Sequence, residues 1–324
     1  MTSLAAAVGL DPALFRAEAI DAETAAFNTQ VAAVLKDAPH VSSRPAAETR
    51  AIRESGEGPW GALVLSDMAV DRTIPGPSGP MRLRTFVPQT VQGVYLHLHG
   101  GGWTLGAAHH TDVVLEQLVK QTQLAVASVE YRLAPEHPYP AGPDDCEAAA
   151  VWLIEHAKSE FGSDRLVIGG ESAGAHLAAN VLVRLRDKHG FFSFHGANLT
   201  FGAFDMSATP SQRSSGPFLV LDTKAMEWFY DQYVPREQRR DPDVSPLYAD
   251  LRNLPPALFT VGTGDPLLDD SLFMYARWIA AGNEAELAIY PGAVHGFTGF
   301  EYPQAHQARR RINDFLEQVV RASA

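Results

Sequence analysis

The sequence predicts an α/β fold in which a mostly parallel sheet is covered by helices on both faces. Short apolar or β-branched runs alternate with longer segments of helical periodicity along most of the 324 residues. Such alternation is typical of parallel strands joined by crossover helices. The sequence contains no internal repeat and no low-complexity tract, which excludes solenoid architectures. Many α/β folds use a chain of this length as one unit.

The expected strands are bounded by Gly, Pro and Asp, the residues that commonly end extended segments. In chain order they cover residues 63–70, 82–87, 93–99, 124–130, 166–170, 199–204, 257–262 and 285–290. The expected helices cover residues 111–121, 144–160, 173–188, 271–281 and 304–320. Because most of the later strands are followed by such a helix, we expect their carboxyl ends to share one edge of the sheet.

Two further segments lie outside this alternation and are candidates for a lid over the sheet edge. The stretch "DAETAAFNTQVAAVLKDAP" begins at residue 21, and its apolar side chains recur at helical spacing until Pro39. Residues 206–245 contain a second apolar stripe that includes Phe229 and Tyr233. Either stripe can be an ordinary core-facing helix face or can line a substrate pocket, and one face can do both.

Composition and charge exclude several classes of protein. With 26 basic and 38 acidic residues the net charge is −12, which argues against nucleic acid or an anionic lipid surface as a partner. No apolar run is long enough to span a bilayer, and the first residues lack the basic region of a signal peptide. The single Cys146 has no disulfide partner within the chain, and we interpret it as structural rather than nucleophilic. A cytoplasmic protein is therefore expected.

A serine follows the strand expected at residues 166–170. Gly170-Glu171-Ser172-Ala173-Gly174 has the form G-x-S-x-G and precedes the helix expected at residues 173–188. On a sharp strand-to-helix turn the hydroxyl projects above the sheet, and small flanking residues let neighbouring elements pack closely. The helix N-terminus beyond it favours developing negative charge. We interpret Ser172 as a nucleophile; the alternative is an N-capping serine at a glycine-rich helix entry.

A serine nucleophile needs a base, and the base needs a carboxylate that orients it. Among 12 histidines, His295 follows the last expected strand on a glycine-flanked loop and therefore reaches the same sheet edge as Ser172. Asp265 directly follows the preceding strand, whereas Asp269 and Asp270 lie at the expected start of a helix, where acids act as caps. The chain order Ser172, Asp265, His295 is that of α/β-hydrolase triads.

Three glycines in "HGGGW", residues 99–103, follow the apolar run "VYLHL". Acyl transfer passes through a tetrahedral oxyanion that preorganised N–H donors stabilise, and glycine lets the main chain approach closely. We therefore expect the amides of Gly101, Gly102 and Ala173 to form the oxyanion hole, with His99 supporting the loop by hydrogen bonds. A flexible turn is the alternative, and a P-loop is excluded because its Lys-Ser/Thr ending is missing.

These motifs together resemble the hormone-sensitive-lipase-like carboxylesterases, a family of the α/β-hydrolase fold. The resemblance runs from about residue 60 to the end of the chain and rests on "HGGGW" at 99–103, "YRLAPEHPYPA" at 131–141, "GESAG" at 170–174, "GDPLLDD" at 264–270 and "HGF" at 295–297. It implies an eight-stranded catalytic domain of residues 56–205 and 246–324 under a helical cap. The cap comprises the N-terminal segment, residues 1–55, and the insertion at residues 206–245.

The resemblance also implies an activity. The family hydrolyses short- to medium-chain acyl esters through an acyl-enzyme intermediate, without a metal or cofactor, and it uses the donors expected above as its oxyanion hole. The partner is then a small-molecule ester, and a homodimer through the edge strand near residues 287–290 is suggested by the family alone. Glu171 stands where the family usually has Asp or Thr. This departure removes no catalytic group but leaves substrate preference open.

The substrate pocket and the rival chemistries are less constrained by the sequence. Trp103, Phe27, Trp228 and Phe229 are candidates for lining an acyl or alcohol pocket, and they can equally be core residues. A metal hydrolase is one rival, with ligands from His97-x-His99 and from the pair His109-His110, but no Asp or Glu sits at close spacing among these histidines. A catalytically inactive binding protein on the same fold is another rival, and the complete triad argues against it.

Overall fold

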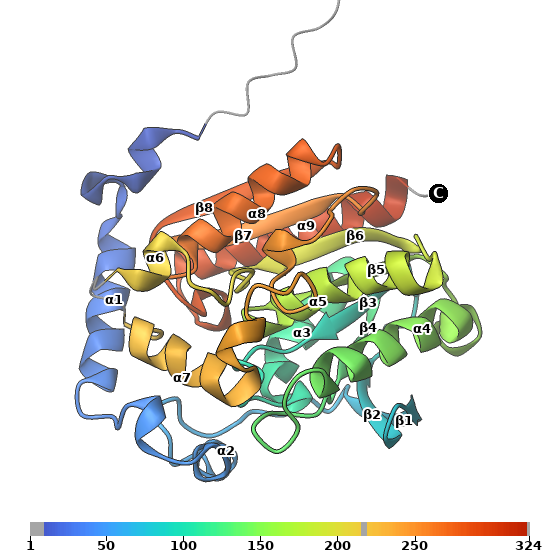
Figure 1. The fold of residues 1–324 in the computed structure, drawn as a ribbon, viewed down its shortest axis with the longest axis horizontal. Coiled ribbons are helices and arrows are strands. Elements are labelled where there is room, and N and C mark those ends of the chain that lie inside the picture. The colour runs from blue at the N-terminus through green and yellow to red at the C-terminus, as the bar shows by residue number, and fades with distance from the viewer. Residues whose placement is uncertain (1–9, 215–218, 323–324) are drawn as a thin grey trace, which may run out of the picture.

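The computed structural model describes residues 10–214 and 219–322, and its centre is one eight-stranded sheet in the order β1-β2-β4-β3-β5-β6-β7-β8 (Figure 1). β2 runs antiparallel to both of its neighbours, and the other pairings are parallel. The strands are β1 (Val70–Gly76), β2 (Gly79–Phe86), β3 (Gly93–Leu98), β4 (Leu124–Val129), β5 (Leu166–Glu171), β6 (Phe194–Thr200), β7 (Ala257–Gly264) and β8 (Ala285–Val294). The predicted α/β class with a mostly parallel sheet is confirmed.

Helices cover both faces of this sheet. They are α3 (Asp112–Thr122), α4 (Ala141–Phe161), α5 (Ala173–Arg184), α8 (Leu268–Ala280) and α9 (Pro303–Ala322). α4 and α5 pack together on one face, and α3 and α9 pack together on the other. Two apolar cores follow from this arrangement, one including Leu153, Leu177 and Trp278, the other including Leu118 and Leu316. The central strands β3 and β4 are buried throughout, as expected for parallel strands between two helical layers.

Two of the expected strands are wrong in position. Residues 63–69 are irregular, and the first strand begins only at Val70, because the apolar side chains that suggested a strand there are largely exposed: Val64 is 68% and Leu65 58% exposed. The strand expected at 199–204 is β6, which begins earlier and ends at Thr200. Phe201 then takes a φ of 37°, which turns the chain out of the sheet.

Four helices lie together at one end of the sheet, at the left of Figure 1. They are α1 (Ala22–Leu35), α2 (Ala46–Ser55), α6 (Pro210–Arg213) and α7 (Thr223–Tyr233). α2 was not expected from the sequence, since it is mostly polar and buries only Ala46. These helices come from the two segments expected to form a cap. Residues 1–9 of the first segment and 215–218 of the second lie outside the described residues, as do 323–324 at the end of the catalytic domain.

The chain after α7 is tied to the catalytic domain through an ion pair. Arg184, at the end of α5, is 3% exposed in its side chain and donates to both carboxylate oxygens of Asp243 at 2.7 and 2.5 Å. Asn180, one turn earlier on α5, donates to the same Oδ1 at 3.1 Å, and Tyr139 donates to Oδ2 at 2.6 Å. The insertion is therefore fixed to the helix that begins beside Ser172.

None of the helices within residues 10–214 and 219–322 combines the length and hydropathy that crossing a bilayer requires.

Candidate active site

Ser172 lies on a tight turn between β5 and α5, with φ 56° and ψ −118°. Such a backbone conformation is costly for a residue with a side chain and is typical of a serine nucleophile on a strand-to-helix turn. The flanking glycines are sterically required, because a Cβ on Gly170 or Gly174 would lie 2.0 or 1.8 Å from the carbonyl oxygen of Leu98. The small residues therefore allow the turn to press against the end of β3.

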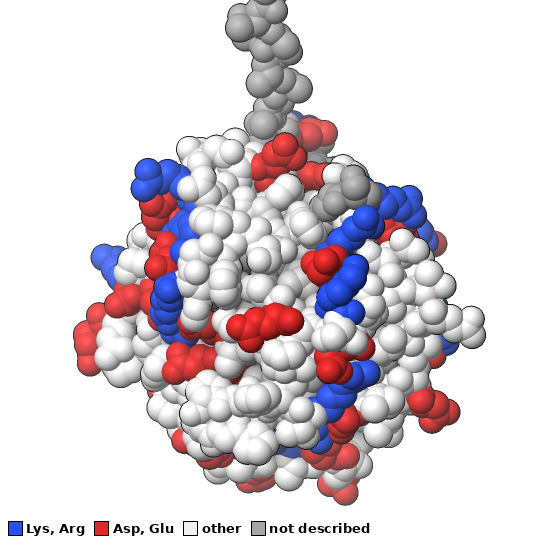
Figure 2. All heavy atoms as spheres, turned by 90° about the vertical axis from the view of Figure 1, so that its right-hand side faces the viewer, with Lys and Arg blue, Asp and Glu red and all other residues white. Residues whose placement is uncertain are grey.

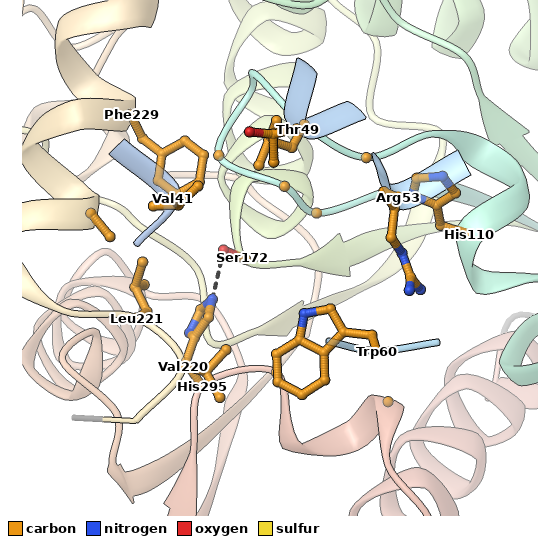
Figure 3. A pocket seen from close by; sticks show the side chains of 18 of the residues that line it. Val41, Thr49, Arg53, Trp60, His110, Ser172, Val220, Leu221, Phe229 and His295 are labelled. Atoms are coloured by element: carbon orange, nitrogen blue, oxygen red, sulfur yellow. Dashed lines mark hydrogen bonds between the residues drawn. The ribbon is translucent and has the colours of Figure 1, made fainter. Parts of the chain in front are cut away.

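His295 and Asp265 come from the ends of β8 and β7 and meet Ser172 at the carboxyl edge of the sheet. His295 Nε2 lies 2.9 Å from Ser172 Oγ (Figure 3). On the other side of the ring, His295 Nδ1 lies 2.9 Å from Asp265 Oδ2. With Nδ1–H donating to the carboxylate, Nε2 is free to accept the serine proton. Asp265 is 1% and His295 9% exposed, so the chain of hydrogen bonds is almost dry. The three residues selected from the sequence are thus brought together.

Asp269 and Asp270, the alternatives to Asp265, have other partners. The Asp269 carboxylate accepts a hydrogen bond from the amide of Ser211 at 2.8 Å. Asp270 is fully buried and accepts hydrogen bonds from the amides of Phe204 and Asp205 at 2.8 and 2.9 Å. Burial raises the pKa of Asp270 to about 7. Both acids therefore hold the start of the inserted segment against α8 and do not reach His295.

The glycine loop after β3 lies beside Ser172, and both Gly101 and Gly102 take positive φ angles there. Gly101 has φ 115°, and a Cβ there would lie 2.2 Å from the carbonyl oxygen of Leu105. Gly102 has φ 59°, and a Cβ there would lie 2.3 Å from the ring of Phe229 on α7. Both positions therefore exclude a side chain on conformational and on steric grounds. The loop is closed by the Leu105 amide, which donates to the Gly101 carbonyl at 2.7 Å.

The amides of Gly101, Gly102 and Ala173 donate to no acceptor among the described residues. Gly101 and Gly102 line the cavity that contains Ser172, and Ala173 is the first residue of α5, where the N–H has no helical partner. Unpaired donors beside a nucleophile, one of them at a helix N-terminus, are suited to bind an anion. The residues expected to form an oxyanion hole thus present free donors at one place.

His99 supports this loop from beneath. Its Nδ1–H donates to the Gly100 carbonyl at 2.8 Å, and its ring stacks on Tyr131 at 4.1 Å between centroids. Burial lowers the pKa of His99 to about 4, so the imidazole is neutral at physiological pH. Its Nε2 is buried without a hydrogen-bond partner among the described residues. His99 therefore positions the loop through Gly100, as the sequence suggested, and lies too deep to reach an ester.

A cavity of ≈ 660 Å³ opens above Ser172. Its walls come from the end of α1, from α2 and the loop that follows, from the glycine loop, and from the segment leading into α7. Figure 3 shows Phe229 and Leu221 on one side of Ser172 and Arg53 and Trp60 on the other. The lining is mostly apolar, which suits an uncharged ester group.

Of the four aromatic residues proposed for the pocket, two line the cavity and two do not. Phe229 lines the cavity, and Trp103 contributes to its floor, although it is only 3% exposed and donates through Nε1 to His176 at 3.0 Å. Phe27 and Trp228 do not line it. Phe27 instead stacks on Tyr302 at 4.1 Å against the other side of α1, so its place in the apolar stripe reflects core packing.

Residues that line the cavity and were missed lie mostly in loops without periodicity. Trp60, Leu219, Val220 and Leu221 belong to irregular segments. Arg53 belongs to α2, the helix that was not expected. A large aromatic side chain in a polar, glycine-rich stretch, as in "EGPWG", was the one available signal for Trp60.

The structure also shows where a metal ion could be held. Glu54, His109 and His110 offer ligand atoms that all lie within 4.8 Å of one another, with Glu54 accepting from the two imidazoles at 3.0 and 2.7 Å. The sequence did not reveal this acid, because Glu54 lies in α2, 55 residues before His109. His97 is engaged elsewhere, with Glu171 at 3.0 Å. A cluster of this kind at the rim is separate from the Ser172–His295 pair, which needs no metal for proton transfer.

Comparisons with known proteins agree with this geometry. Residues 95–299 match the α/β hydrolase fold family. The chain is 36% identical over 268 residues to the carboxylic ester hydrolase LipN of Mycobacterium tuberculosis, covering 79% of this chain and 70% of that protein. It is 34% identical to carboxylesterase NlhH of the same organism, covering 80% of this chain and 85% of that protein. A hyperthermophilic esterase from Pyrobaculum calidifontis has a similar structure, with a TM-score of 0.80 at 29% identity over 95% of this chain and 98% of that one.

Proposed function

Because the chain belongs to the hormone-sensitive-lipase-like carboxylesterases of the α/β hydrolase fold, we propose that Ser172, His295 and Asp265 are its catalytic triad. It is a serine carboxylesterase that hydrolyses carboxylic esters. The observation that carries the assignment of the triad is the unbroken pair of 2.9 Å contacts from Ser172 Oγ through the imidazole to Asp265. Ser172 is also the single serine among the described residues that line the cavity.

Acylation then follows from the geometry. Ser172 Oγ attacks the carbonyl carbon of the ester as its proton passes to His295 Nε2, and the carbonyl π electrons move onto oxygen. We propose that the free amides of Gly101, Gly102 and Ala173 bind this oxyanion. When the carbonyl re-forms, the ester C–O bond breaks, and His295 gives its proton to the departing alkoxide, which leaves as the alcohol.

Deacylation repeats these steps with water as the nucleophile. Water occupies the place of the alcohol, gives a proton to His295 and attacks the acyl-enzyme carbonyl. Collapse of the second tetrahedral intermediate returns the proton to Ser172 and releases the carboxylic acid. The imidazole is cationic only between these proton transfers, and the adjacent Asp265 carboxylate stabilises that cation at both stages.

We infer that the substrates are soluble esters with short to medium acyl chains. A cavity of ≈ 660 Å³ with walls from several segments accepts a small molecule and encloses most of it. Two relatives have names that fit this range, an ethyl acetate hydrolase of Pseudomonas putida at 33% identity and an acetyl esterase of Salmonella at 29% identity. The length of acyl chain accepted depends on Phe229 and Leu221, which limit one side of the cavity.

The function is tested with 4-nitrophenyl esters of increasing acyl length. We expect the wild type to hydrolyse the shorter members with equal rates in the presence and absence of EDTA. Ser172→Ala should lose at least about 10³-fold in kcat, because the nucleophile acts together with the base and the oxyanion donors. Retained turnover in the variant, or loss of turnover with EDTA in the wild type, would contradict the serine mechanism and favour the metal cluster at Glu54.

We propose further that the protein is cytoplasmic and that β8 can mediate a homodimer. Cys146 is the single cysteine and is buried, which suits a reducing compartment. β8 is an edge strand of the sheet, and an unpaired strand edge can pair with a second copy. Acidic and basic side chains alternate on the face shown in Figure 2, so that face offers no continuous basic track for nucleic acid. Light scattering after size exclusion would report the mass and so test the dimer.

A further inference from the structure

Among the described residues, the arginines of the cavity lining form ion pairs with acids, with one exception. Arg44 Nε lies 3.3 Å from the carboxylate of Glu48, four residues later in the first turn of α2, and Arg50 forms an ion pair with Glu136. Arg50 also donates to main-chain carbonyls, so its role is to hold α2 on the domain below. Arg53 lines the same cavity but has no carboxylate partner among the described residues.

The acids of the cavity lining are engaged as well. Asp222 lies 3.2 Å from His40 and accepts the amide of Ala225 as the N-cap of α7. Glu171 lies 3.0 Å from the buried His97. Neither acid forms an ion pair with Arg53, so among the described residues Arg53 is the one arginine of the cavity lining without such a partner.

Arg53 is half-buried and makes a single long hydrogen bond, from Nη1 to the Gly61 carbonyl at 3.4 Å. By contrast, Arg84 and Arg132, elsewhere in the molecule, donate hydrogen bonds to the carboxylates of Asp112 and Asp145. A charge that loses water without gaining a partner is unfavourable. Binding an anion would remove that cost, so the free protein is preorganised for one.

The neighbouring Glu54 attracts the Arg53 guanidinium electrostatically but does not fill this role. Its carboxylate accepts hydrogen bonds from His109 and His110, and it forms no ion pair with Arg53. Figure 3 shows the Arg53 side chain extending from α2 toward Trp60, on the side of Ser172 away from Phe229. The guanidinium donors therefore remain available on the cavity side.

We propose that Arg53 binds a carboxylate carried by the substrate, so that this esterase acts on esters that are also monoanions. The inference rests on the proposed function, since the ester group must lie at Ser172 while the carboxylate lies at Arg53. A guanidinium pairs with a carboxylate through two parallel hydrogen bonds. One cation matches the single charge of a carboxylate better than a phosphate monoester, which carries nearly two charges at neutral pH.

The test compares charged with neutral esters of the same length at low ionic strength, because salt screens a half-exposed ion pair. On the acyl side the pair is mono-4-nitrophenyl adipate and 4-nitrophenyl hexanoate. On the alcohol side the pair is 4-acetoxybenzoate and 4-methylphenyl acetate. For each pair we measure the ratio of kcat/KM for the charged ester to kcat/KM for the neutral ester. Intrinsic reactivity cancels when this ratio is compared between enzyme variants.

We expect Arg53→Met to lower this ratio at least about tenfold in one of the two pairs, since a charge-assisted hydrogen bond is lost. Arg53→Lys keeps the charge without the fork and should lower the ratio less. Lys36→Met, an exposed change in the same N-terminal segment, removes the same net charge and should leave the ratio unchanged. The pair that responds identifies whether the carboxylate lies on the acyl or on the alcohol side.

Unchanged ratios in both pairs, with normal turnover of the neutral esters, would overturn the inference and leave the proposed function intact. A loss of ratio in Lys36→Met equal to that in Arg53→Met would also overturn it, because the effect would then be one of net charge. If wild type turned over none of the four esters, the proposed function would fail and this inference with it. Turnover of the neutral esters by Arg53→Met reports whether that variant is folded.

Discussion

The Asp265 carboxylate uses its two oxygens for two partners. Oδ2 accepts from His295 Nδ1–H at 2.9 Å, and Oδ1 accepts from the Leu267 amide at 2.8 Å. The second contact fixes the plane of the carboxylate, so the first can hold the imidazole in one orientation and one tautomer. A residue that only stabilised positive charge would not need the contact with Leu267.

Asp265→Asn should therefore change the tautomer of His295 and not the fold. If the Leu267 amide keeps the Asn oxygen in place, the Asn NH2 faces His295 Nδ1, which must then accept a hydrogen bond. The imidazole proton therefore lies on Nε2, and Nε2 can no longer take up the serine proton. We expect kcat to fall by about 10³ to 10⁴, as the same change does in serine proteases, with KM and the thermal midpoint nearly unchanged. Steady-state kinetics check this, with Asp269→Asn as the control, and an active Asp265→Asn variant would contradict the proposed triad.

Gly102 makes a second prediction, because its missing Cβ gives space to Phe229. Gly102→Ala places a methyl group 2.3 Å from that ring at a φ of 59°, so we expect loss of at least about 10² in kcat/KM through displacement of an oxyanion donor. Adding Phe229→Ala removes the clash but not the unfavourable φ. In kinetic and thermal melting measurements, the double variant should recover part of the kcat/KM and of the melting temperature that Gly102→Ala loses. Strictly additive losses from the two changes would count against this contact as the cause.

At this scale the sequence could predict that the three residues of the proposed triad meet, but it could predict the cavity lining only in part. Ser172, Asp265 and His295 follow strand ends, so strand order alone places them at one edge. Phe27 and Trp228 share helical stripes with residues that line or support the cavity, and periodicity does not say which face of a helix meets substrate. Arg53 gave no signal, since an unpaired charge is defined by the absence of a partner in space.

At the scale of elements, α5 has two functions at its two ends. Its N-terminus carries Ser172 and the free Ala173 amide, and its C-terminus carries Arg184, which binds Asp243 of the inserted segment. Twelve residues of helix thus join the nucleophile to the anchor of the insertion. The same helix is buried on nearly all sides, so it is a rigid connection.

Asp243→Ala should destabilise the protein, because it leaves Arg184 buried with fewer partners. Breaking a buried ion pair costs about 3 kcal/mol, and Asp144 and Glu147 offset part of that cost here. We expect a lower urea midpoint and a lower kcat/KM, since the wall formed by α7 loses its anchor. Asp250→Ala removes an acid from the fully exposed pair with Arg252 and serves as the control. Equal urea midpoints for the two variants would show that the anchor is not energetically important.

The elements of the sheet domain could be predicted from the sequence better than those around the cavity. The strands and helices of the sheet domain have strong apolar patterns because both faces of the sheet are buried. The strand expected at 63–70 was wrong because apolar residues can also be exposed in a loop. α2 was missed because its residues contact a cavity and paired side chains rather than an apolar core, so its pattern is polar.

For the whole molecule, buried titratable groups set the response to acid. Burial lowers the pKa of His99 and of His176 to about 4, so the folded protein binds fewer protons than the unfolded chain between about pH 6.5 and pH 4. The stability contributed by these two groups is present above pH 6.5 and is lost as the pH falls toward 4. Asp270, with its pKa raised to about 7, has the opposite sign, and its contribution is lost as the pH rises toward 7.

Two histidines outweigh one carboxyl group, so we expect the free energy of unfolding to be lower at pH 5 than at pH 7 by on the order of 1–2 kcal/mol. His176→Gln should reduce this difference, and Asp270→Asn should increase it, whatever their effects at pH 7. Urea titrations at the two pH values measure both. His306→Gln is the control, since that imidazole is 43% exposed, and a wild type more stable at pH 5 would contradict the balance.

The walls of the cavity and the groups that react come from different stretches of chain. The proposed triad and oxyanion donors follow strand ends, whereas the walls are largely residues 35–60 and 219–230. Natural variation can therefore alter which esters are recognised while the bond-breaking apparatus stays constant.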